Sequence, residues 1–301
     1  MGLARAVPAR LRVVDSVTDL RDADRGALAV TGSHAGRYSG AVAAAAGVAA
    51  AAFNDAGVGL DRAGVAGLEV LAELGIPAWA VSHLSARIGE GAQTLCGRVG
   101  AVNESAAMLG VVCGMSGADA LTAVDSAESV AATRNADQGK PDAPPAVVAR
   151  GDVQRGRSIC RVGELTVRVL DSASLIESRD VGAVVVTGSH GATPGSDPAR
   201  AVRWPVAFAA FNDAGMGKDE AGVSRIVVLG ERFIPAVAVA AVSARIGEGR
   251  STLFDGVVSY LNRTAAACGL VAGEPLMDQL RTLSGVFAGP AAGAVERKDQ
   301  R

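Results

Sequence analysis

The chain has 301 residues, of which 49% are hydrophobic and 3% aromatic, and its formal net charge is −2. This much apolar material suffices for a sizeable core of mostly small aliphatic side chains, which excludes a wholly disordered chain. The near-neutral charge, with no block of like charges, argues against a nucleic-acid-binding protein, which would carry a basic patch.

No targeting or membrane-spanning segment is evident in the sequence. The chain begins MGLARAVPARLRVVDS, which lacks the apolar segment of a signal peptide. Its most apolar stretch, residues 41–53, is mostly alanine and too short to span a bilayer. The four cysteines form no Cys-x-x-Cys pair, and no cysteine–histidine spacing typical of zinc occurs. We therefore expect a cytoplasmic protein whose partners include neither a membrane nor a nucleic acid.

In chain order, the first half of the sequence predicts alternating strands and helices. Short apolar runs that end in small polar residues predict strands at LRVVDS (11–16), GALAVTGSH (26–34), VAAAAFNDAG (48–57) and IPAWAVS (76–82). Helices are predicted over residues 61–75, where apolar residues recur at helical spacing, and over residues 89–110; each closes on a glycine. Strands that are apolar on both faces and alternate with helices are typical of a mostly parallel sheet covered on both sides.

The second half repeats these phrases in the same order. FNDAGVGLDRAGV recurs as FNDAGMGKDEAGV, LRVVDS as VRVLDS, GALAVTGSH as GAVVVTGSH, and IPAWAVSHLSARIGEG as IPAVAVAAVSARIGEG. The α/β fold that we predict is therefore a tandem duplication: two similar lobes, each a mostly parallel sheet flanked by helices, related by a pseudo-twofold axis. We expect the first repeat over residues 1–125, a polar proline-containing linker over 126–163, the second repeat over 164–285 and a flexible tail over 286–301.

Three repeated polar phrases follow predicted strands, and these are the strongest functional signal in the sequence. They are T-G-S-H, F-N-D-A-G-x-G and S-A-R-I-G-E-G. Open α/β sheets bind ligands beyond the carboxyl ends of their strands, which is where these phrases are predicted to lie. A duplicated fold must repeat its apolar positions, but it has less need to repeat Ser, His, Asn, Asp, Arg and Glu in loops.

The T-G-S-H phrase supplies Ser33 and His34 in the first copy and Ser189 and His190 in the second. The serines are candidate nucleophiles on a sharp strand-to-helix turn, and the turn could also cradle an anion with backbone N–H groups. The alternative is a structural one, in which each serine caps the next helix.

The N-D-A-G phrase supplies Asn54 and Asp55, with Asn212 and Asp213 as their counterparts. Either aspartate could be a general base, a metal ligand or the group that orients a histidine. The structural alternative is an Asx-type turn in which glycine adopts a positive φ.

The S-A-R-I-G-E-G phrase is a candidate carboxylate-binding segment. Its polar residues are Ser85, Arg87 and Glu90 in the first copy and Ser243, Arg245 and Glu248 in the second. Arginine could offer a planar fork to a carboxylate or phosphate, with glutamate holding it in place. The alternative is a surface arginine–glutamate pair, which would contribute little.

His83 is the one histidine without a counterpart, since Ala241 stands at the matching position. If WAVS is a strand, alternation places His83 and Ser85 on one face, with Arg87 nearby. An imidazole can take and return protons at cellular pH. The first copy would then hold the complete acid/base site, and the second would bind or support.

These residues predict an enzyme that acts on a small carboxylate-bearing metabolite, most plausibly by hydrolysis of an amide or ester bond. In this reading a serine attacks, a histidine moves the proton, an aspartate orients the histidine, and an arginine holds the carboxylate. The alternatives are an isomerase or lyase with a pseudo-symmetric acid/base site between the repeats, and a non-catalytic protein that binds an organic anion. Neither a dinucleotide motif nor a P-loop occurs, so we expect no cofactor. A divalent metal held by Asp, Glu and His is not excluded by the sequence, and neither is a homo-oligomer.

Overall fold

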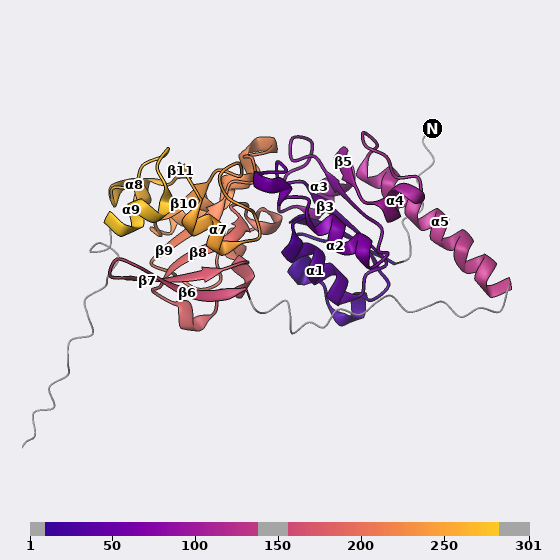
Figure 1. The fold of residues 1–301 in the computed structure, drawn as a ribbon, viewed down its shortest axis with the longest axis horizontal. Helices are drawn as coiled ribbons and strands as arrows, with labels where there is room; N and C mark the ends of the chain where they lie inside the picture. Colours follow the sequence, from indigo (N-terminus) through magenta and orange to yellow (C-terminus); the bar gives the residue numbers. More distant parts are fainter. Residues whose placement is uncertain (1–9, 138–155, 283–301) are drawn as a thin grey trace, which may run out of the picture.

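The computed structural model describes residues 10–137 and 156–282 (Figure 1). Within them, one sheet has the order β1-β2-β3-β4-β5 and another the order β11-β10-β9-β8-β7-β6. We call the parts that carry these sheets lobe 1 and lobe 2; they lie side by side along the longest axis of the molecule. The strands of lobe 1 are β1 (Leu11–Val14), β2 (Leu28–His34), β3 (Ala50–Asn54), β4 (Ala78–Val81) and β5 (Val99–Val102). Those of lobe 2 are β6 (Arg157–Val162), β7 (Leu165–Leu170), β8 (Val184–His190), β9 (Phe208–Asn212), β10 (Ala236–Val239) and β11 (Val258–Leu261).

Both sheets are mixed but mostly parallel, as the sequence predicts. Strands β1 to β4 pair in parallel, and β5 joins β4 in antiparallel fashion. Strands β7 to β10 do the same, with β11 and β6 as antiparallel edge strands. The register of both central pairs shifts near the end, where His34 meets Asn54 and His190 meets Asn212. The expected α/β class is therefore confirmed.

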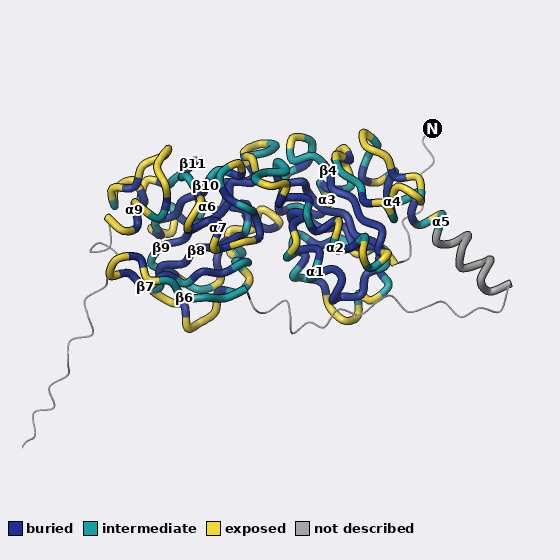
Figure 2. The backbone as a smooth tube through the Cα atoms, in the orientation of Figure 1, coloured by how far each residue is buried: buried dark blue, intermediate teal, exposed yellow. Residues whose placement is uncertain are grey.

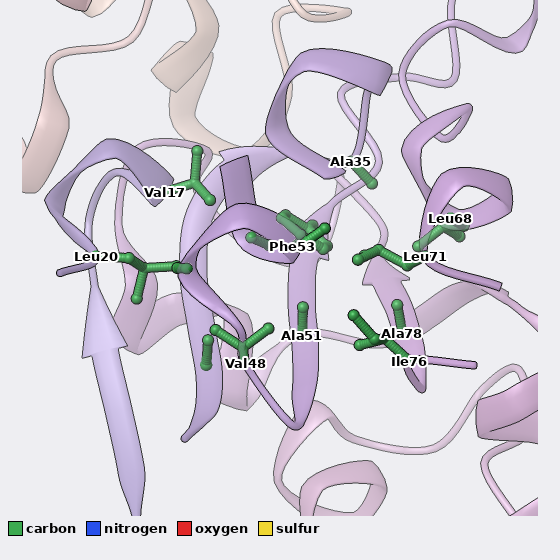
Figure 3. Packing of buried hydrophobic residues seen from close by; sticks show 14 of the residues in the cluster. Val17, Leu20, Ala35, Val48, Ala51, Phe53, Leu68, Leu71, Ile76 and Ala78 are labelled. Atoms are coloured by element: carbon green, nitrogen blue, oxygen red, sulfur yellow. The ribbon is translucent and has the colours of Figure 1, made fainter. Parts of the chain in front are cut away.

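Helices cover both faces of each sheet. Those of lobe 1 are α1 (Arg37–Ala46), α2 (Gly67–Glu73), α3 (Gly91–Cys96), α4 (Glu104–Met108) and α5 (Gly117–Asp137). Those of lobe 2 are α6 (Ser224–Glu231), α7 (Gly249–Phe254), α8 (Arg263–Ala267) and α9 (Leu276–Thr282). Alternation along the strands sends Phe53 to one face, against Leu68 and Leu71 of α2 (Figure 3), and Trp79 to the other, with Leu121 of α5. The strands are buried throughout the middle of both lobes (Figure 2).

Two predicted helices differ from the structure. The segment 89–110 is not one helix, because it contains α3, the strand β5 and α4. Gly97 ends α3 and lies directly against Val81, where a Cβ would come within 2.8 Å; this close contact lets the chain turn back and pair with β4. In the segment 61–75, the α-helix begins only at Gly67, since the turn before it contains residues with positive φ such as Asp61.

The predicted linker over 126–163 is too wide. Helix α5 extends to Asp137, and β6 occupies Arg157–Val162, where it forms an antiparallel pair with β7. The rest of that range, 138–155, and the predicted flexible tail over 286–301 lie outside the described residues. Among the residues that are described, no helix is long and apolar enough to cross a membrane.

The lobes differ in the segment that follows the T-G-S-H strand. In lobe 1, β2 is followed by the ten-residue helix α1. In lobe 2, β8 is followed instead by two short 3-10 turns, Pro194–Ser196 and Pro198–Arg200. Prolines at the start of each turn remove backbone donors and restrict φ, which favours a tight turn over a longer helix.

Candidate functional site

The repeated phrases lie at the carboxyl edges of the two sheets, and these edges face each other. Parallel strands β2, β3 and β4 end at one edge, and β8, β9 and β10 end at the corresponding edge of lobe 2. Main-chain hydrogen bonds join the two edges: Leu60 donates to Ala241 at 2.8 Å, and Lys218 donates to His83 at 2.8 Å. Gly195 donates to Gly89 at 2.7 Å. The phrases therefore build the contact between the lobes.

Small side chains allow the edges to approach closely. Ala56, Ala63 and Ile88 of lobe 1 form one buried cluster with Ala192, Ala214, Ala221 and Ile246 of lobe 2. Gly57 and Gly215 meet across the contact, where a Cβ on either would lie 3.2 Å from the other's Cα. Both glycines have φ above +70°. Their conservation between the two phrases follows from this packing.

A pocket of about 680 Å³ lies beside this contact and is lined by both lobes. We call it the inter-lobe pocket and define it by Ser33, His34, Tyr38, Ser189, His190, Arg200 and Arg225. It contains both T-G-S-H phrases, so the structure brings together four of the residues predicted to carry catalysis.

Each pocket serine accepts a hydrogen bond from the main chain. Ser33 Oγ accepts from Val17 N at 2.9 Å, and Ser189 Oγ accepts from Ala173 N at 2.8 Å. A hydroxyl that accepts in this way keeps its hydrogen for another partner. Both serines therefore present a donor to the pocket.

The two pocket histidines are fixed in the same tautomer. His34 Nδ1 accepts from Gly36 N at 3.0 Å, and His190 Nδ1 accepts from Ala192 N at 3.2 Å. An Nδ1 that accepts must carry a lone pair, which places the proton of the neutral ring on Nε2. The rings lie edge to face, with centroids 6.3 Å apart.

Burial keeps both imidazoles neutral. Loss of water lowers the pKa of His34 to about 4. Burial, then the positive charge of Arg225, lowers the pKa of His190 well below 6.5. At neutral pH each ring is therefore an uncharged N–H donor and not a cation.

The sequence analysis missed three residues of the pocket, Tyr38, Arg200 and Arg225, of which Arg225 is the most deeply buried. It is 4% exposed, its Nε donates to the Ala192 carbonyl at 3.1 Å, and its guanidinium lies over the Phe211 ring at 4.8 Å. Its Nη1 is buried and has no hydrogen-bond partner among the described residues. Burial, then the charge of Arg200, lowers the pKa of Arg225 to about 9, so the group stays charged at neutral pH.

Arg225 is not repeated, since Gly67 stands at the matching position of the first copy, so repetition gives no signal for it. The available signal was periodicity: Arg225 and Leu229 are four residues apart and share the buried face of α6. A charged residue on the apolar stripe of a helix is informative, because charges are seldom buried without a partner.

Two further residues of the pocket bridge the lobes. Arg200 of lobe 2 pairs with Asp15 at 3.3 Å and with Asp19 at 2.5 Å, both in lobe 1. Burial raises the pKa of the Tyr38 hydroxyl, and hydrogen bonds with Ser174 and Ser172 of lobe 2 oppose this rise. The charge of Arg200 is therefore compensated within the protein, unlike that of Arg225.

The asparagines of the N-D-A-G phrases lie under the loops and outside the pocket. Asn54 Nδ2 donates to the Ala86 carbonyl at 3.1 Å, and its Oδ1 accepts from Ala56 N at 2.9 Å. Asn212 makes the same two contacts, with Ala244 at 3.0 Å and Ala214 at 2.9 Å. Both amides tie the end of a strand to the S-A-R-I-G-E-G loop.

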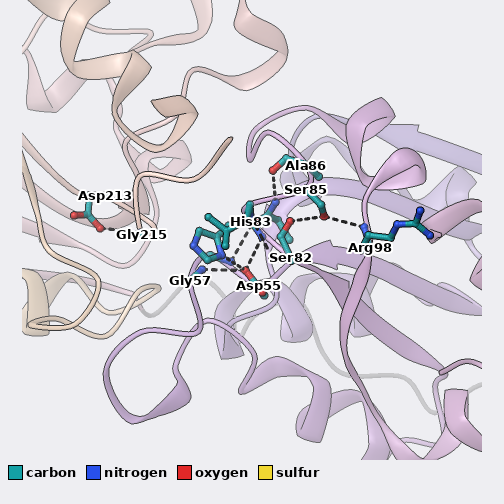
Figure 4. A network of polar contacts seen from close by, with 12 residues as sticks. Asp55, Gly57, Ser82, His83, Ser85, Ala86, Arg98, Asp213 and Gly215 are labelled. Carbon is teal, nitrogen blue, oxygen red and sulfur yellow. Dashed lines mark hydrogen bonds and ion pairs between the residues drawn. The ribbon is translucent and has the colours of Figure 1, made fainter. Parts of the chain in front are cut away.

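Asp55 and His83 form a pair at the contact between the lobes (Figure 4). Asp55 Oδ1 lies 2.9 Å from His83 Nδ1 and also accepts from the His83 main-chain N–H at 2.8 Å. The carboxylate thus orients the imidazole, and the ring lies close to Gly215 of lobe 2. In lobe 2, Asp213 instead accepts from the Ala241 N–H and from the Ser259 hydroxyl, each at 2.8 Å.

The sequence analysis placed Ser85 and His83 on one face by strand alternation, but the strand ends before both residues. Strand β4 ends at Val81, so both residues lie in the following turn, where strand alternation does not apply. Ser85 Oγ donates to the Ser82 carbonyl at 2.9 Å and accepts from Arg98 N at 2.8 Å. Ser243 makes the matching contacts with Ala240 and Val257.

The arginines of the S-A-R-I-G-E-G loops are occupied by carboxylates of the protein. Arg87 Nε donates to Glu90 at 2.7 Å, and its Nη1 lies 3.2 Å from Asp219 of lobe 2. Arg245 lies 2.6 Å from Asp61 of lobe 1. Each of these arginines therefore forms an ion pair with a carboxylate of the other lobe.

Glu90 and Glu248 also differ in their surroundings. Glu90 accepts a second hydrogen bond, from Ser196 of lobe 2. Glu248 lines another pocket of about 610 Å³ together with Arg245, and burial raises the pKa of its carboxyl group. Neither residue lines the inter-lobe pocket.

The described part of the chain offers no group of three or more His, Cys, Asp or Glu side chains that could hold a metal ion. Comparison with protein-family models, with curated proteins and with solved structures gave no match. The function is therefore argued from the geometry of the site.

Proposed function

We propose that the chain binds a small organic anion in the inter-lobe pocket. The observation that carries this proposal is Arg225, a buried guanidinium whose Nη1 has no hydrogen-bond partner. Within the described residues no carboxylate lies at ion-pair distance from it. A desolvated, unpaired charge costs several kcal/mol, and an anionic ligand would offset that cost.

The remainder of the pocket lining supports the same proposal. The hydroxyls of Ser33 and Ser189 and the Nε2–H groups of His34 and His190 are hydrogen-bond donors. Donors that converge on a pocket match the oxygen acceptors of a carboxylate. A volume of about 680 Å³ is suitable for a small metabolite.

We also propose that the lobes derive from a duplication and are related by a pseudo-twofold axis. Matched contacts support this, beyond the repeated phrases. Asp15 Oδ1 accepts from Gly91 N at 3.1 Å, and Asp171 Oδ1 accepts from Gly249 N at 3.0 Å. A cytoplasmic location and a homo-oligomeric state remain predictions from the sequence.

Hydrolysis of an amide or ester bond is the second candidate. The observation in its favour is the set of neutral N–H and O–H donors, which could stabilise the oxyanion of a tetrahedral intermediate. A serine nucleophile also needs a base, and the Nε2 atoms of the pocket histidines carry protons. His83 has the tautomer of a base, because its Nδ1 faces Asp55, but it lies outside the pocket. An isomerase with two facing bases has less support, because the Nε2 atoms of both pocket histidines carry protons and cannot accept one.

The test is binding of small carboxylates by calorimetry to the wild-type protein and to Arg225→Met. A charge-assisted hydrogen bond contributes about 1.5–3 kcal/mol, so the variant should bind about 10- to 150-fold more weakly. Arg281→Met is the matched control, since Arg281 is exposed, pairs with Asp278 and lies outside the pocket. Equal affinity of the wild type and Arg225→Met for every carboxylate bound would contradict the proposal.

A further inference from the structure

Arg225, the buried arginine of the inter-lobe pocket, has no counterpart on the opposite wall. Arg225 of lobe 2 corresponds in the repeat to Gly67 of lobe 1. Gly67 packs against the first turn of α1, and a Cβ there would lie 2.3 Å from the Gly36 carbonyl oxygen. Lobe 1 therefore has no room for a second arginine at this place.

Lobe 1 contributes uncharged donors to the same pocket. His34 is neutral and presents its Nε2–H, because Nδ1 accepts from Gly36. Ser33 accepts from Val17 and presents its hydroxyl hydrogen. An uncharged donor is well matched to an uncharged oxygen acceptor such as a carbonyl. On lobe 2, Arg225 lies next to the segment that follows His190, because its main-chain N–H donates to the Gly191 carbonyl at 2.7 Å and its Nε donates to the Ala192 carbonyl at 3.1 Å.

On the basis of the proposed anion site, we infer that the ligand is a short carboxylic acid that also carries an uncharged carbonyl oxygen. Its carboxylate would contact Arg225 and His190 of lobe 2. Its oxo, ester or amide oxygen would accept hydrogen bonds from His34 and Ser33 of lobe 1. The pocket thus binds its ligand in one orientation, although both lobes offer a T-G-S-H phrase.

The same lining disfavours an ammonium group on the ligand. A cation would lie near Arg225, and the pocket histidines cannot accept from it, because their Nε2 atoms are protonated. The carboxylates in the lining are engaged: Asp19 pairs with Arg200 at 2.5 Å, and Glu177 pairs with Arg179 at 2.7 Å. Amino acids should therefore bind more weakly than the corresponding oxo acids.

Four five-carbon acids test this inference on the wild-type protein: pentanoate, 2-oxopentanoate, 4-oxopentanoate and 2-aminopentanoate. We expect at least one oxo acid to bind about tenfold more tightly than pentanoate, the effect of one good hydrogen bond, and 2-aminopentanoate to bind more weakly than 2-oxopentanoate. His34→Phe should lower the affinity for the oxo acid about tenfold more than the affinity for pentanoate, which removes the preference for the oxo acid. Ser189→Ala, on the opposite lobe, is the matched control and should keep the preference.

The outcomes separate this inference from the proposed function. If pentanoate and both oxo acids bind equally and all depend on Arg225, the anion site stands and the inference is wrong. If an oxo acid is preferred but His34→Phe and Ser189→Ala change the preference equally, the proposed orientation is wrong. If none of the acids depends on Arg225, the proposed function itself fails.

Discussion

Replacing Arg225 with methionine should make the ligand-free protein more stable. The wild-type protein buries a guanidinium whose Nη1 has no partner in the part of the chain that the structure describes, at a cost of several kcal/mol after relaxation. The variant loses the hydrogen bond to the Ala192 carbonyl and the contact with the Phe211 ring, each worth about 1 kcal/mol. The free energy of unfolding should therefore rise by about 1–3 kcal/mol, while carboxylate binding is lost.

The assay is urea-induced unfolding without added anions, and Arg157→Met is the contrasting variant. Arg157 Nη2 donates to both carboxylate oxygens of Asp180, at 2.7 and 3.0 Å, and Asp180 is fully buried. Removal of this arginine leaves the buried carboxylate with a more distant cation, Arg168 at 4.0 Å, and should cost up to about 3–5 kcal/mol. The two arginine-to-methionine substitutions should thus change the free energy of unfolding in opposite directions. If Arg225→Met destabilises the protein as Arg157→Met does, Arg225 is a packing residue and the reasoning that leads to an anion site is refuted.

Three more predictions follow from contacts described above. Burial makes His34 and His190 harder to protonate in the folded state, so the unfolded chain binds more protons below pH 6.5. The free energy of unfolding should therefore fall by up to about 1.4 kcal/mol per pH unit for each histidine as the pH drops from 6.5 towards 4. Urea unfolding between pH 5 and 7 measures this slope, and a flat profile would contradict the prediction. Asn54→Ala and Asn212→Ala should each cost about 2–3 kcal/mol in the same assay, and a large difference between them would show that the matched contacts are not equivalent. Gly32→Ala should destabilise by about 3 kcal/mol or more, since its Cβ would lie 2.4 Å from Glu90 N; near-wild-type urea stability would rule out this close approach.

The strands that carry the T-G-S-H and N-D-A-G phrases could be predicted because their apolar runs end abruptly in polar residues. Strand β5 could not be, since Val99–Val102 is short, contains Gly100, and shows neither alternation nor a long apolar run. Strand β6 is an edge strand with Arg157 and Arg161 in it, so its composition resembles a linker. In both cases pairing with a neighbouring strand outweighs weak local preference.

The candidate site was predicted in part, and the limit was the use of repetition as the signal. Repetition identified Ser33 and His34 with their counterparts, which line the inter-lobe pocket. It also identified Asn54, whose amide ties a strand to a loop. Repeated polar residues thus include structural ones as well as pocket residues, and the sequence alone cannot separate the two roles. Arg225 is not repeated, and only the fold shows that no carboxylate in residues 10–137 and 156–282 pairs with it.

Because both lobes belong to one polypeptide, a residue can change on one wall of the pocket while its counterpart stays the same. Arg225 faces a lobe that has Gly67 at the matching position. In an assembly of two identical single-lobe chains, one codon change would alter both walls at once. Such a pocket would hold either two desolvated guanidiniums, whose repulsion adds to the cost of burial, or none. When one gene encodes both lobes this constraint is absent, so selection can place a charged residue on one wall and keep a small residue at the matching position of the other.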